Sequence, residues 1–205
     1  MPARVCIVAA SPHAGGTTAA IARYLRLGIE RAGERAEILS IAGKRLLGCV
    51  HCGACRRPPH RCALEGQDDT ALLLETVEDA GLLFWVSPVY FYGLPAQAKA
   101  LVDRAQSRWE RLRRMEAEPG VPETDGGEGS GRPTELVLLA GQERGRLLFE
   151  GSRLALRYFF ETLGRDTPGR KELRGLDGPR DITPAMAGDL SSWARNRVLT
   201  WRAKA

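Results

Sequence analysis

The sequence predicts an α/β fold in which one parallel β-sheet is covered by helices on both faces. Residues 5–10 and 81–86 form apolar runs, which is typical of strands buried on both faces of a parallel sheet, and residues 135–140 form a further strand that is apolar after Glu135. Each run is followed by a short loop and then by an amphipathic helical pattern, so the chain repeats a strand–helix unit with right-handed crossovers. With 205 residues, the chain is long enough to bury one full core, and we expect residues 1–205 to form a single domain.

The first half of the chain predicts three strands and two helices. Residues 5–10 form the first strand, Thr17 to Ala32 the first helix, which Gly33 ends, and residues 36–41 the second strand. Residues 43–67 form a cysteine-rich loop, because Pro58-Pro59 excludes a helix there. Asp68 or Asp69 caps a helix that runs to about Asp79, and the third strand covers residues 81–86.

The second half predicts two more strands and three helices. Pro95 opens a helix over residues 96–114, and residues 115–133, rich in glycine, proline and acidic residues, form a flexible loop. The fourth strand follows at 135–140 and a helix at 149–163. A weak edge strand is expected at 172–176, and the last helix covers about 185–202.

Small and hydroxyl-bearing residues fill the loop from Ser11 to Thr18, between the first strand and the first helix. Backbone N–H groups in such a loop, together with the positive end of the helix dipole, can bind a phosphate group. The spacing matches neither GxGxxG nor GxxxxGK[ST]. Two interpretations therefore stay open from these residues alone, a phosphate site or an ordinary turn.

Three consecutive aromatic residues, Tyr90, Phe91 and Tyr92, follow the third strand in a turn-rich loop. Side chains at that position are poorly placed to fill a core. They are better explained as a platform for a flat ligand at the carboxyl end of the sheet.

Charge is unevenly distributed along the chain. The formal net charge is +5, and residues 1–64 carry ten Lys or Arg side chains but only three Glu. A basic first third suits an anionic ligand, although an arginine-rich, solvated surface explains it equally well. No basic motif interleaved with aromatic residues indicates nucleic acid binding, no apolar run is long enough to cross a bilayer, and residues 1–4 show no secretory signal. We therefore expect a cytoplasmic protein without nucleic-acid or membrane partners.

Four of the five cysteines, Cys49, Cys52, Cys55 and Cys62, fall within fourteen residues. In a cytoplasmic chain, such clustering favours metal binding or redox chemistry over a disulfide framework. Cys6 lies inside the first strand and is expected to be a small core residue.

Three blocks of residues together resemble one protein family. They are Ser11-Pro12-His13-x-x-Gly16-Thr17-Thr18, then Gly48-Cys49-x-x-Cys52-Gly53-x-Cys55, then Ser87-Pro88-Val89-Tyr90 running on to Lys99-x-x-x-Asp103-Arg104. The chain resembles the NADPH-dependent FMN reductase-like flavoproteins over residues 4 to about 163. This resemblance implies a flavodoxin-like three-layer sandwich with a five-stranded parallel sheet in the order 2-1-3-4-5, and flavin mononucleotide (FMN) at the switch point of the sheet.

The resemblance also implies which residues bind FMN. The phosphate side is expected at Ser11, His13, Gly16, Thr17 and Thr18, the isoalloxazine ring beside Pro88, Val89, Tyr90, Phe91, Tyr92 and Gly93, and the opposite wall at Gly141 and Gln142. His13 departs from the family, which often has arginine there. A histidine carries its charge only part of the time near neutral pH, so the phosphate would depend more on backbone N–H groups and hydroxyls.

Within this family, the cysteine block resembles that of the iron–sulfur flavoproteins, which implies that Cys49, Cys52, Cys55 and Cys62 ligate a [4Fe–4S] cluster. Thiolates at this spacing can turn inward on one loop and bind one cluster. Zinc, with His51 or His60 as a substitute ligand, and a loop without any metal are the alternatives.

As a function, the resemblance implies an FMN-dependent oxidoreductase. It would pass electrons from NAD(P)H or a ferredoxin-type donor through FMN to a small-molecule or protein acceptor, and the protein would form a homo-oligomer, either a dimer or a tetramer. No side chain is identified as catalytic, because the flavin carries out the chemistry. A non-enzymatic electron-transfer or redox-sensing flavoprotein and a zinc-stabilised interaction domain are the competing functions.

Overall fold

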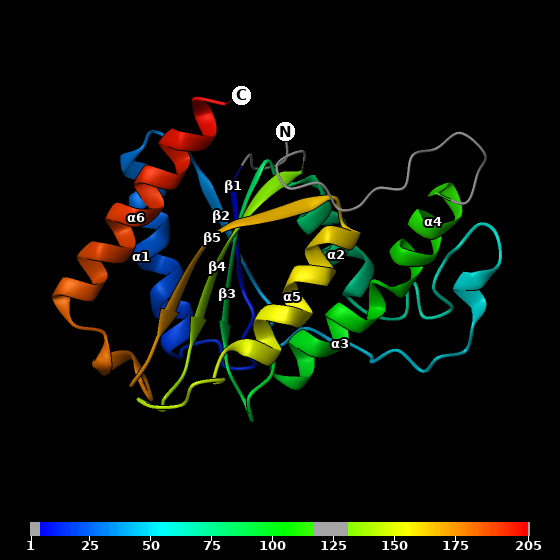
Figure 1. The fold of residues 1–205 in the computed structure, drawn as a ribbon, viewed down its shortest axis with the longest axis horizontal. Helices are drawn as coiled ribbons and strands as arrows, with labels where there is room; N and C mark the ends of the chain where they lie inside the picture. Colours follow the sequence, from blue (N-terminus) through cyan, green and yellow to red (C-terminus); the bar gives the residue numbers. More distant parts are fainter. Residues whose placement is uncertain (1–4, 117–130, 205) are drawn as a thin grey trace.

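The computed structural model describes residues 5–116 and 131–204. Its centre is a five-stranded parallel sheet in the order β2-β1-β3-β4-β5 (Figure 1). The strands are β1 (Val5–Ala9), β2 (Ala36–Ser40), β3 (Leu82–Pro88), β4 (Arg132–Leu139) and β5 (Arg165–Leu173). The predicted flavodoxin-like sheet and its strand order are confirmed.

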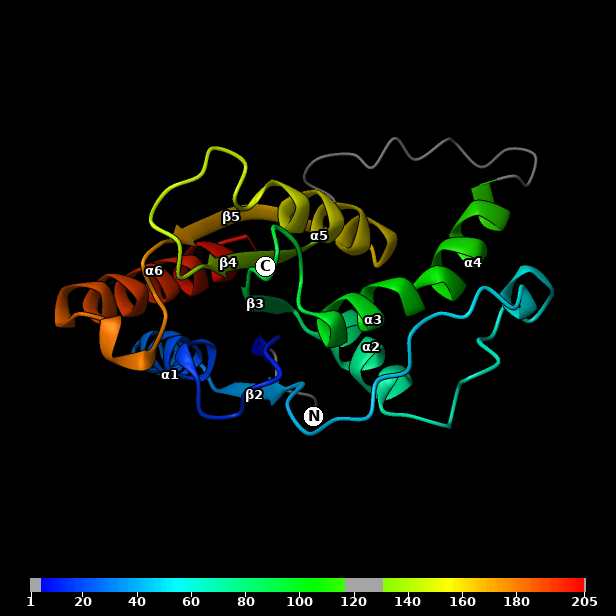
Figure 2. The ribbon, with the colours of Figure 1, turned by 90° about the horizontal axis from the view of Figure 1, so that it is seen from below.

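Helices cover both faces of the sheet. They are α1 (Thr17–Arg31), α2 (Thr70–Asp79), α3 (Ala96–Arg104), α4 (Gln106–Glu116), α5 (Glu150–Thr162) and α6 (Pro184–Arg202). Helices α1 and α6 lie on one face and α2, α3 and α5 on the other, which gives three layers (Figures 1 and 2). Helix α4 and the cysteine-rich loop project together beyond the edge of the layers.

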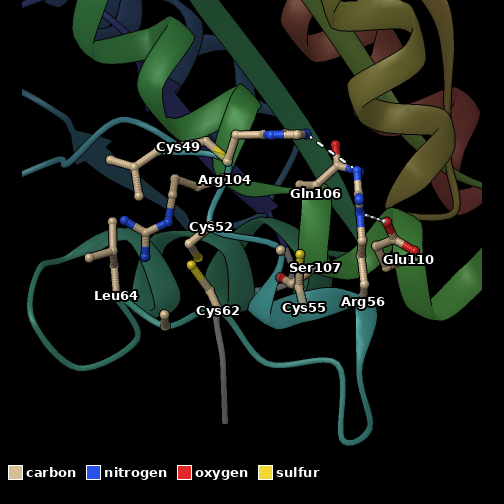
Figure 3. A pocket seen from close by; sticks show the side chains of 14 residues that line it. Cys49, Cys52, Cys55, Arg56, Cys62, Leu64, Arg104, Gln106, Ser107 and Glu110 are labelled. Carbon is tan, nitrogen blue, oxygen red and sulfur yellow. Dashed lines mark hydrogen bonds and ion pairs between the residues drawn. The ribbon is translucent and has the colours of Figure 1, made fainter.

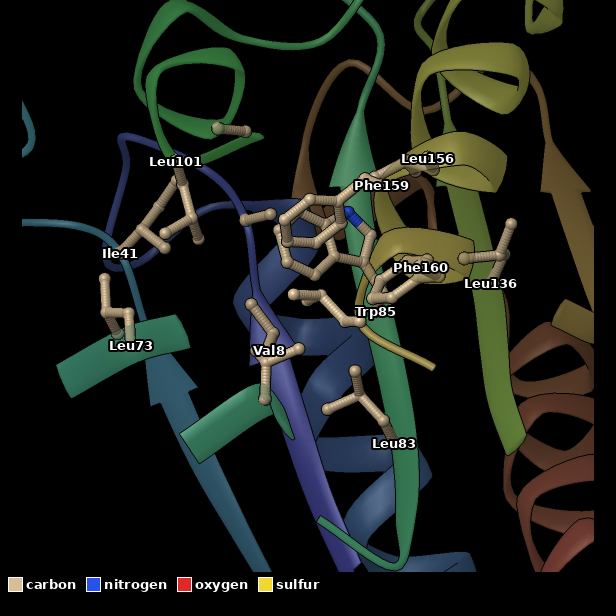
Figure 4. Close-up of a cluster of buried hydrophobic side chains, with 14 of the residues drawn as sticks. Val8, Ile41, Leu73, Leu83, Trp85, Leu101, Leu136, Leu156, Phe159 and Phe160 are labelled. Atoms are coloured by element: carbon tan, nitrogen blue, oxygen red, sulfur yellow. The ribbon is translucent and has the colours of Figure 1, made fainter. Parts of the chain in front are cut away.

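Alternating strand residues build a hydrophobic core on each side of the sheet. On the α2–α3–α5 side, Trp85 is fully buried and packs edge-on against Phe160, with ring centroids 5.6 Å apart (Figure 4). On the other side, Phe84 contacts Trp193 of α6 in the same manner at 5.7 Å. Burial on both faces explains why β1, residues 82–86 of β3 and residues 136–139 of β4 are apolar at every position. Glu135 of β4 is a buried exception, and its carboxylate pairs with Arg197.

The predicted helix over residues 96–114 is wrong as one helix, because the chain turns at Ala105 and continues as α4. Neither glycine nor proline marks the turn. The Arg104 side chain is held by Leu47 and Asp68, while the next turn of the chain faces the cysteine-rich loop. Contacts with a remote loop, which no local pattern encodes, therefore set the direction of α4.

The predicted edge strand at 172–176 is misplaced, because β5 covers residues 165–173. Pro168 and Gly169 lie inside the strand, and its exposed positions are mostly charged. An edge strand tolerates proline because one of its sides has no strand partner. The residues that actually form β5 therefore show only a weak apolar pattern. Strand β4 likewise begins three residues before the predicted start at 135.

Two predicted loops differ in how far the structure describes them. Most of the expected flexible loop at 115–133 lies outside the described residues. At its two ends, Met115 and Glu116 belong to α4, and Arg132 and Pro133 belong to β4. The cysteine-rich loop at 43–67 is described in full and contains one short 3-10 turn at Ala54–Arg56. The helix after it starts at Thr70, whose N–H donates to Asp68 Oδ1 at 3.2 Å, whereas Asp69 at the N-cap position makes no capping bond with its side chain.

Candidate cofactor pocket and cysteine pocket

A cavity of about 690 Å³ opens at the carboxyl ends of β1, β3 and β4, within the size range of sites for cofactors and small molecules. The loops that follow these three strands, together with the connection between β5 and α6, form its walls. It is lined by Ser11, His13, Gly16, Thr17, Thr18, Pro88, Val89, Tyr90, Phe91, Tyr92, Leu139, Ala140, Gly141, Gln142, Leu148, Leu176, Asp177 and Pro179. We call this cavity the carboxyl-end pocket.

The first wall is the start of α1. Gly16 occupies the N-cap position, and no side chain among the described residues caps the helix there. The first N–H groups of a helix need acceptors from outside it, and here they border the cavity beside the buried Thr17 and Thr18. Ser11 shapes the preceding loop, because its Oγ accepts a hydrogen bond from the His13 N–H at 3.2 Å. This wall can bind an anionic group.

The second wall is a tight turn over residues 90–93. Tyr90 and Gly93 exchange backbone hydrogen bonds of 2.9 and 3.0 Å, while Phe91 and Tyr92 have φ angles of 49° and 62°. Left-handed backbone at two consecutive aromatic residues costs of order 1–3 kcal/mol each. The turn leaves the Phe91 side chain fully exposed at the rim of the pocket. Backbone strain of this kind persists only where neighbouring structure holds it.

Two glycines provide that support for the turn. A Cβ at Gly151, in the first turn of α5, would lie 2.5 Å from the Tyr92 carbonyl oxygen. A Cβ at Gly145 would lie 3.5 Å from the Tyr92 hydroxyl oxygen, and Gly145 itself has a φ of 132°. The aromatic turn therefore packs directly against backbone that has no side chain.

The third wall combines the loop after β4 with the connection between β5 and α6. Gly141 lies against Asp177, whose carboxylate a Cβ at Gly141 would overlap. Hydrogen bonds between backbone atoms tie the two segments together, from Leu176 N to Ala140 O at 3.0 Å and from Gly175 N to Gln142 O at 3.4 Å. A carboxylate and a main-chain segment thus line this part of the cavity.

Of the thirteen residues predicted to bind the cofactor, twelve line this pocket; Gly93 closes the aromatic turn but is not in the lining. Sequence reasoning missed Leu139, Ala140, Leu148, Leu176, Asp177 and Pro179. Leu139 and Ala140 could have been found as the end of a strand. Leu176, Asp177 and Pro179 depend on the path of the chain after β5, whose position was predicted wrongly.

The four clustered cysteines line a second, smaller pocket, which we call the cysteine pocket. The loop contributes Cys49, Cys52, Cys55 and Cys62, and α3 and α4 contribute Arg104, Ser107 and Glu110 (Figure 3). All four thiols are free, and Cys49 and Cys52 are exposed. The space between these groups is only about 30 Å³. Four thiols around one space form a soft donor set of the kind that binds iron–sulfur clusters or zinc.

Burial and the nearby Glu110 carboxylate raise the pKa of the Cys55 thiol. Glu110 is itself buried, 3.6 Å from the Arg56 Nε and 3.2 Å from the Arg113 guanidinium. Because metals bind the thiolate, ligation at Cys55 would release a proton.

Both histidines of the loop make contacts within it. His60 Nδ1 lies 2.9 Å from the Cys55 carbonyl oxygen, and His51 Nε2 lies 3.3 Å from an Arg56 guanidinium nitrogen. Within residues 5–116 and 131–204, no three His, Cys, Asp or Glu side chains are grouped closely enough to hold a single metal ion. A cubane differs from a single ion in that each thiolate binds a different iron atom.

A buried ion pair closes the base of the cysteine-rich loop. Asp68 Oδ2 accepts hydrogen bonds from the Leu47 N–H at 2.8 Å and from Arg104 Nη1 at 2.9 Å, and Arg104 Nη1 also donates to the Leu47 carbonyl oxygen at 3.1 Å. Burial alone would raise the pKa of the Asp68 carboxyl. Hydrogen bonds from Leu47 and Thr70 and the charge of Arg104 outweigh burial and lower it. We call the contacts among Leu47, Asp68 and Arg104 the loop clasp.

The sheet order and the pocket at its carboxyl edge define a flavodoxin-like α/β protein with a site for a ligand at the switch point. Residues 3–143 match the family model of the NADPH-dependent FMN reductases, and the chain belongs to this family. The predicted family is therefore confirmed, and membership implies FMN as the flavin and NAD(P)H as its reductant.

Comparison with curated proteins gives relatives in sequence, and comparison with solved structures gives chains of the same fold. An iron-sulfur flavoprotein of Methanocaldococcus jannaschii is 32% identical over 103 residues, 50% of this chain and 52% of that protein. The chain spans about half the length of the curated relatives it matches. Two solved structures share the fold. One is a flavone reductase, with a TM-score of 0.68 and 11% identity, and the match covers 97% of this chain and 62% of that one. The other is an azoreductase from Bacillus anthracis, with a TM-score of 0.65 and 13% identity, and the match covers 94% of this chain and 98% of that one. No helix of the described residues is long and apolar enough to cross a membrane.

Proposed function

We propose that the protein is an FMN-dependent oxidoreductase that passes electrons from NAD(P)H or a ferredoxin-type donor, through FMN in the carboxyl-end pocket, to a small-molecule or protein acceptor. The observation that carries this proposal is the convergence of three loops, remote in sequence, on one cavity of about 690 Å³. Bound FMN would supply the hydride and single-electron chemistry. The protein would bind and orient the flavin.

The start of α1 is the proposed phosphate site. Its uncapped N–H groups, together with the buried Thr17 and Thr18, present donors without a carboxylate from the same loop. His13 is exposed at the rim and can add a further donor. A dianionic phosphate at a helix N-terminus is favoured both by these donors and by the helix dipole.

The aromatic turn is the proposed neighbour of the flavin ring. Tyr90 and Tyr92 are each about half exposed, although they lie beside a cavity that can hold a planar ligand. Gly141 and Gln142 would bound the ring on the opposite side. A rigid, strained turn suits this role because it fixes aromatic surface before the ligand arrives.

For the cysteine pocket we propose a [4Fe–4S] cluster held by Cys49, Cys52, Cys55 and Cys62. Four free thiols facing one space support this assignment, as does the likeness to iron-sulfur flavoproteins. The present space is small, so the thiol side chains would have to turn outward around the inorganic core. Residues 43–53 and 57–69 lie outside helices and strands, which leaves them freedom to do so.

The test is anaerobic absorbance spectroscopy of the purified full chain after incubation with FMN, iron and sulfide. We expect stoichiometric flavin that bleaches on addition of NADPH, together with about four irons and four sulfides per chain. A chain that binds no FMN would overturn the flavin site. Flavin binding without iron, or stoichiometric zinc, would overturn the cluster and leave the flavin assignment intact.

A further inference from the structure

We propose that Arg104 is a positioning residue for the cysteine pocket. The Arg104 Nε–H would donate a hydrogen bond to a sulfur atom in that pocket and raise the reduction potential of the proposed [4Fe–4S] cluster. This inference rests on the proposed cluster. Arg104 belongs to the Lys99-x-x-x-Asp103-Arg104 block, whose side chains otherwise have no part in the proposed flavin site.

The first support is an unused donor. The Arg104 side chain is 2% exposed, and its Nε is buried without a hydrogen-bond partner among the described residues. A buried N–H group without an acceptor costs about 1–3 kcal/mol, more when the group is charged. The same side chain lines the cysteine pocket (Figure 3). A sulfur ligand in that pocket would provide the missing acceptor.

The second support is the rigidity of the guanidinium group. Its Nη1 is held by Asp68 at 2.9 Å and by the Leu47 carbonyl oxygen at 3.1 Å, so the loop clasp fixes the group in position. The thiols lie on a loop with little regular structure, whereas Arg104 is the last residue of α3, in the helical layer that covers one face of the sheet. The clasp thus presents one fixed donor to a loop that has to adjust its shape.

Hydrogen bonds and positive charge near sulfur ligands raise the reduction potential of an iron–sulfur centre, because reduction adds one negative charge. Arg104 brings a buried positive charge, and Asp68 brings its counter-charge. Glu110 of α4 is a buried negative group that lines the same pocket, with the exposed Arg56 and Arg113 as its partners. Removing Arg104 or Asp68 should therefore shift the potential in opposite directions.

The experiment compares Arg104→Gln, Asp68→Asn and the double variant in the anaerobically reconstituted full chain. The matched control is Arg108→Gln, since Arg108 pairs with Glu78 at 3.1 Å and does not line the cysteine pocket. The midpoint potential of the cluster is measured by dye-mediated titration with low-temperature electron paramagnetic resonance. Iron, sulfide and FMN are counted on the same samples.

We expect a lower potential in Arg104→Gln, a higher one in Asp68→Asn, an intermediate value in the double variant and no change in Arg108→Gln. A clasp that is only structural would instead shift both single variants in the same direction, or would leave both unshifted and lower only the iron content. Either result overturns the inference.

Two further outcomes are decisive as well. If Arg104→Gln does not retain iron, the midpoint potential of the cluster in Asp68→Asn decides between the two roles of Arg104. A lower or unchanged midpoint potential in Asp68→Asn contradicts the proposed role of Arg104. If the unmodified chain binds FMN but holds no iron or sulfide, the proposed cluster fails and this inference fails with it. That result is distinguished from the others by the iron count alone.

Discussion

Gly151 lies directly beneath the main chain of Tyr92, and a Cβ at Gly151 would lie only 2.5 Å from the Tyr92 carbonyl oxygen. The contact joins the first turn of α5 to the strained aromatic turn of the carboxyl-end pocket. Because the clash is with backbone rather than with a flexible side chain, Gly151→Ala must displace the turn.

We expect Gly151→Ala to weaken FMN binding by about 1–3 kcal/mol, the usual range for an overpacked contact. Isothermal titration with FMN measures this. Gly188→Ala is the matched control, because Gly188 also lies in a helix but an added Cβ there would meet nothing within 4 Å. It should bind FMN normally and gain roughly 0.5–1 kcal/mol of stability. Equal FMN affinity in the two variants would contradict the close support of the turn.

Thr18→Val should also weaken FMN binding, by on the order of 1–3 kcal/mol, because it removes a hydroxyl donor from the proposed phosphate wall. Ser11→Ala is expected to act in the same direction, since Ser11 also holds the His13 N–H in place. Thr76→Val is the control, with a helical threonine whose hydroxyl donates to the Leu72 carbonyl oxygen far from the pocket. If both pocket variants bind FMN as tightly as the control, the phosphate lies elsewhere.

Burial raises the pKa of the Cys6 thiol from 9.0 to about 12, with a further increase from Glu37 and a smaller opposing effect of Arg165. The unfolded chain loses this proton near pH 9, whereas the folded chain retains it to about pH 12. The stabilising contribution is therefore complete below pH 9 and is lost as the pH rises towards 12.

We expect the free energy of unfolding of the unmodified chain to fall relative to Cys6→Ala above pH 9, by up to about 1.4 kcal/mol per pH unit. Urea unfolding between pH 7 and 11 gives the difference. Val8→Ala, which shortens a buried neighbour on the same face of β1, should show a difference that does not vary with pH. A constant difference for Cys6→Ala as well would mean that this thiol ionises as readily in the folded chain as in the unfolded one.

Gly28 sits where α1 crosses α6, and a Cβ there would overlap the Ser191 carbonyl oxygen. We expect Gly28→Ala to lower the free energy of unfolding by about 1–3 kcal/mol, because two helix backbones would have to separate. Urea unfolding of Gly28→Ala and of the control Gly188→Ala checks this. Gly188 lies in α6, and a Cβ there would meet nothing within 4 Å. Equal stability of the two variants would show that α6 can move away from α1 without loss.

Local sequence patterns predicted the interior of the fold well and its edges less well. The segments at 5–10, 82–86 and 136–140 are apolar at every position because both faces of the sheet are covered there, so their signal is strong. Strand β5 has one neighbouring strand among the described residues and contains Pro168 and Gly169, so its apolar pattern is faint. Because the strand was predicted at 172–176 and not at 165–173, Asp177 was not recognised as a residue of the pocket.

Charged residues placed by tertiary contacts were not accessible to sequence reasoning. Arg165 is fully buried, where its guanidinium donates to the carbonyl oxygens of Val77, Ala80 and Pro133 and to the Thr134 hydroxyl. Burial lowers its pKa to about 10. Arginine is usually exposed, and nothing near position 165 indicates acceptors some 85 residues away in the chain. The pairing of Arg104 with Asp68 was hidden for the same reason.

The hydrogen bond between the Leu47 N–H and Asp68 brings the two ends of the cysteine-rich loop together at one point of the fold. A segment that leaves and re-enters at the same place puts no tension on the strands around it, whatever its length. The residues between Leu47 and Asp68 thus behave as an insert on a complete flavodoxin-like scaffold. We therefore expect that such an insert can be shortened or exchanged as a unit, while the sheet and its carboxyl-end pocket keep their architecture.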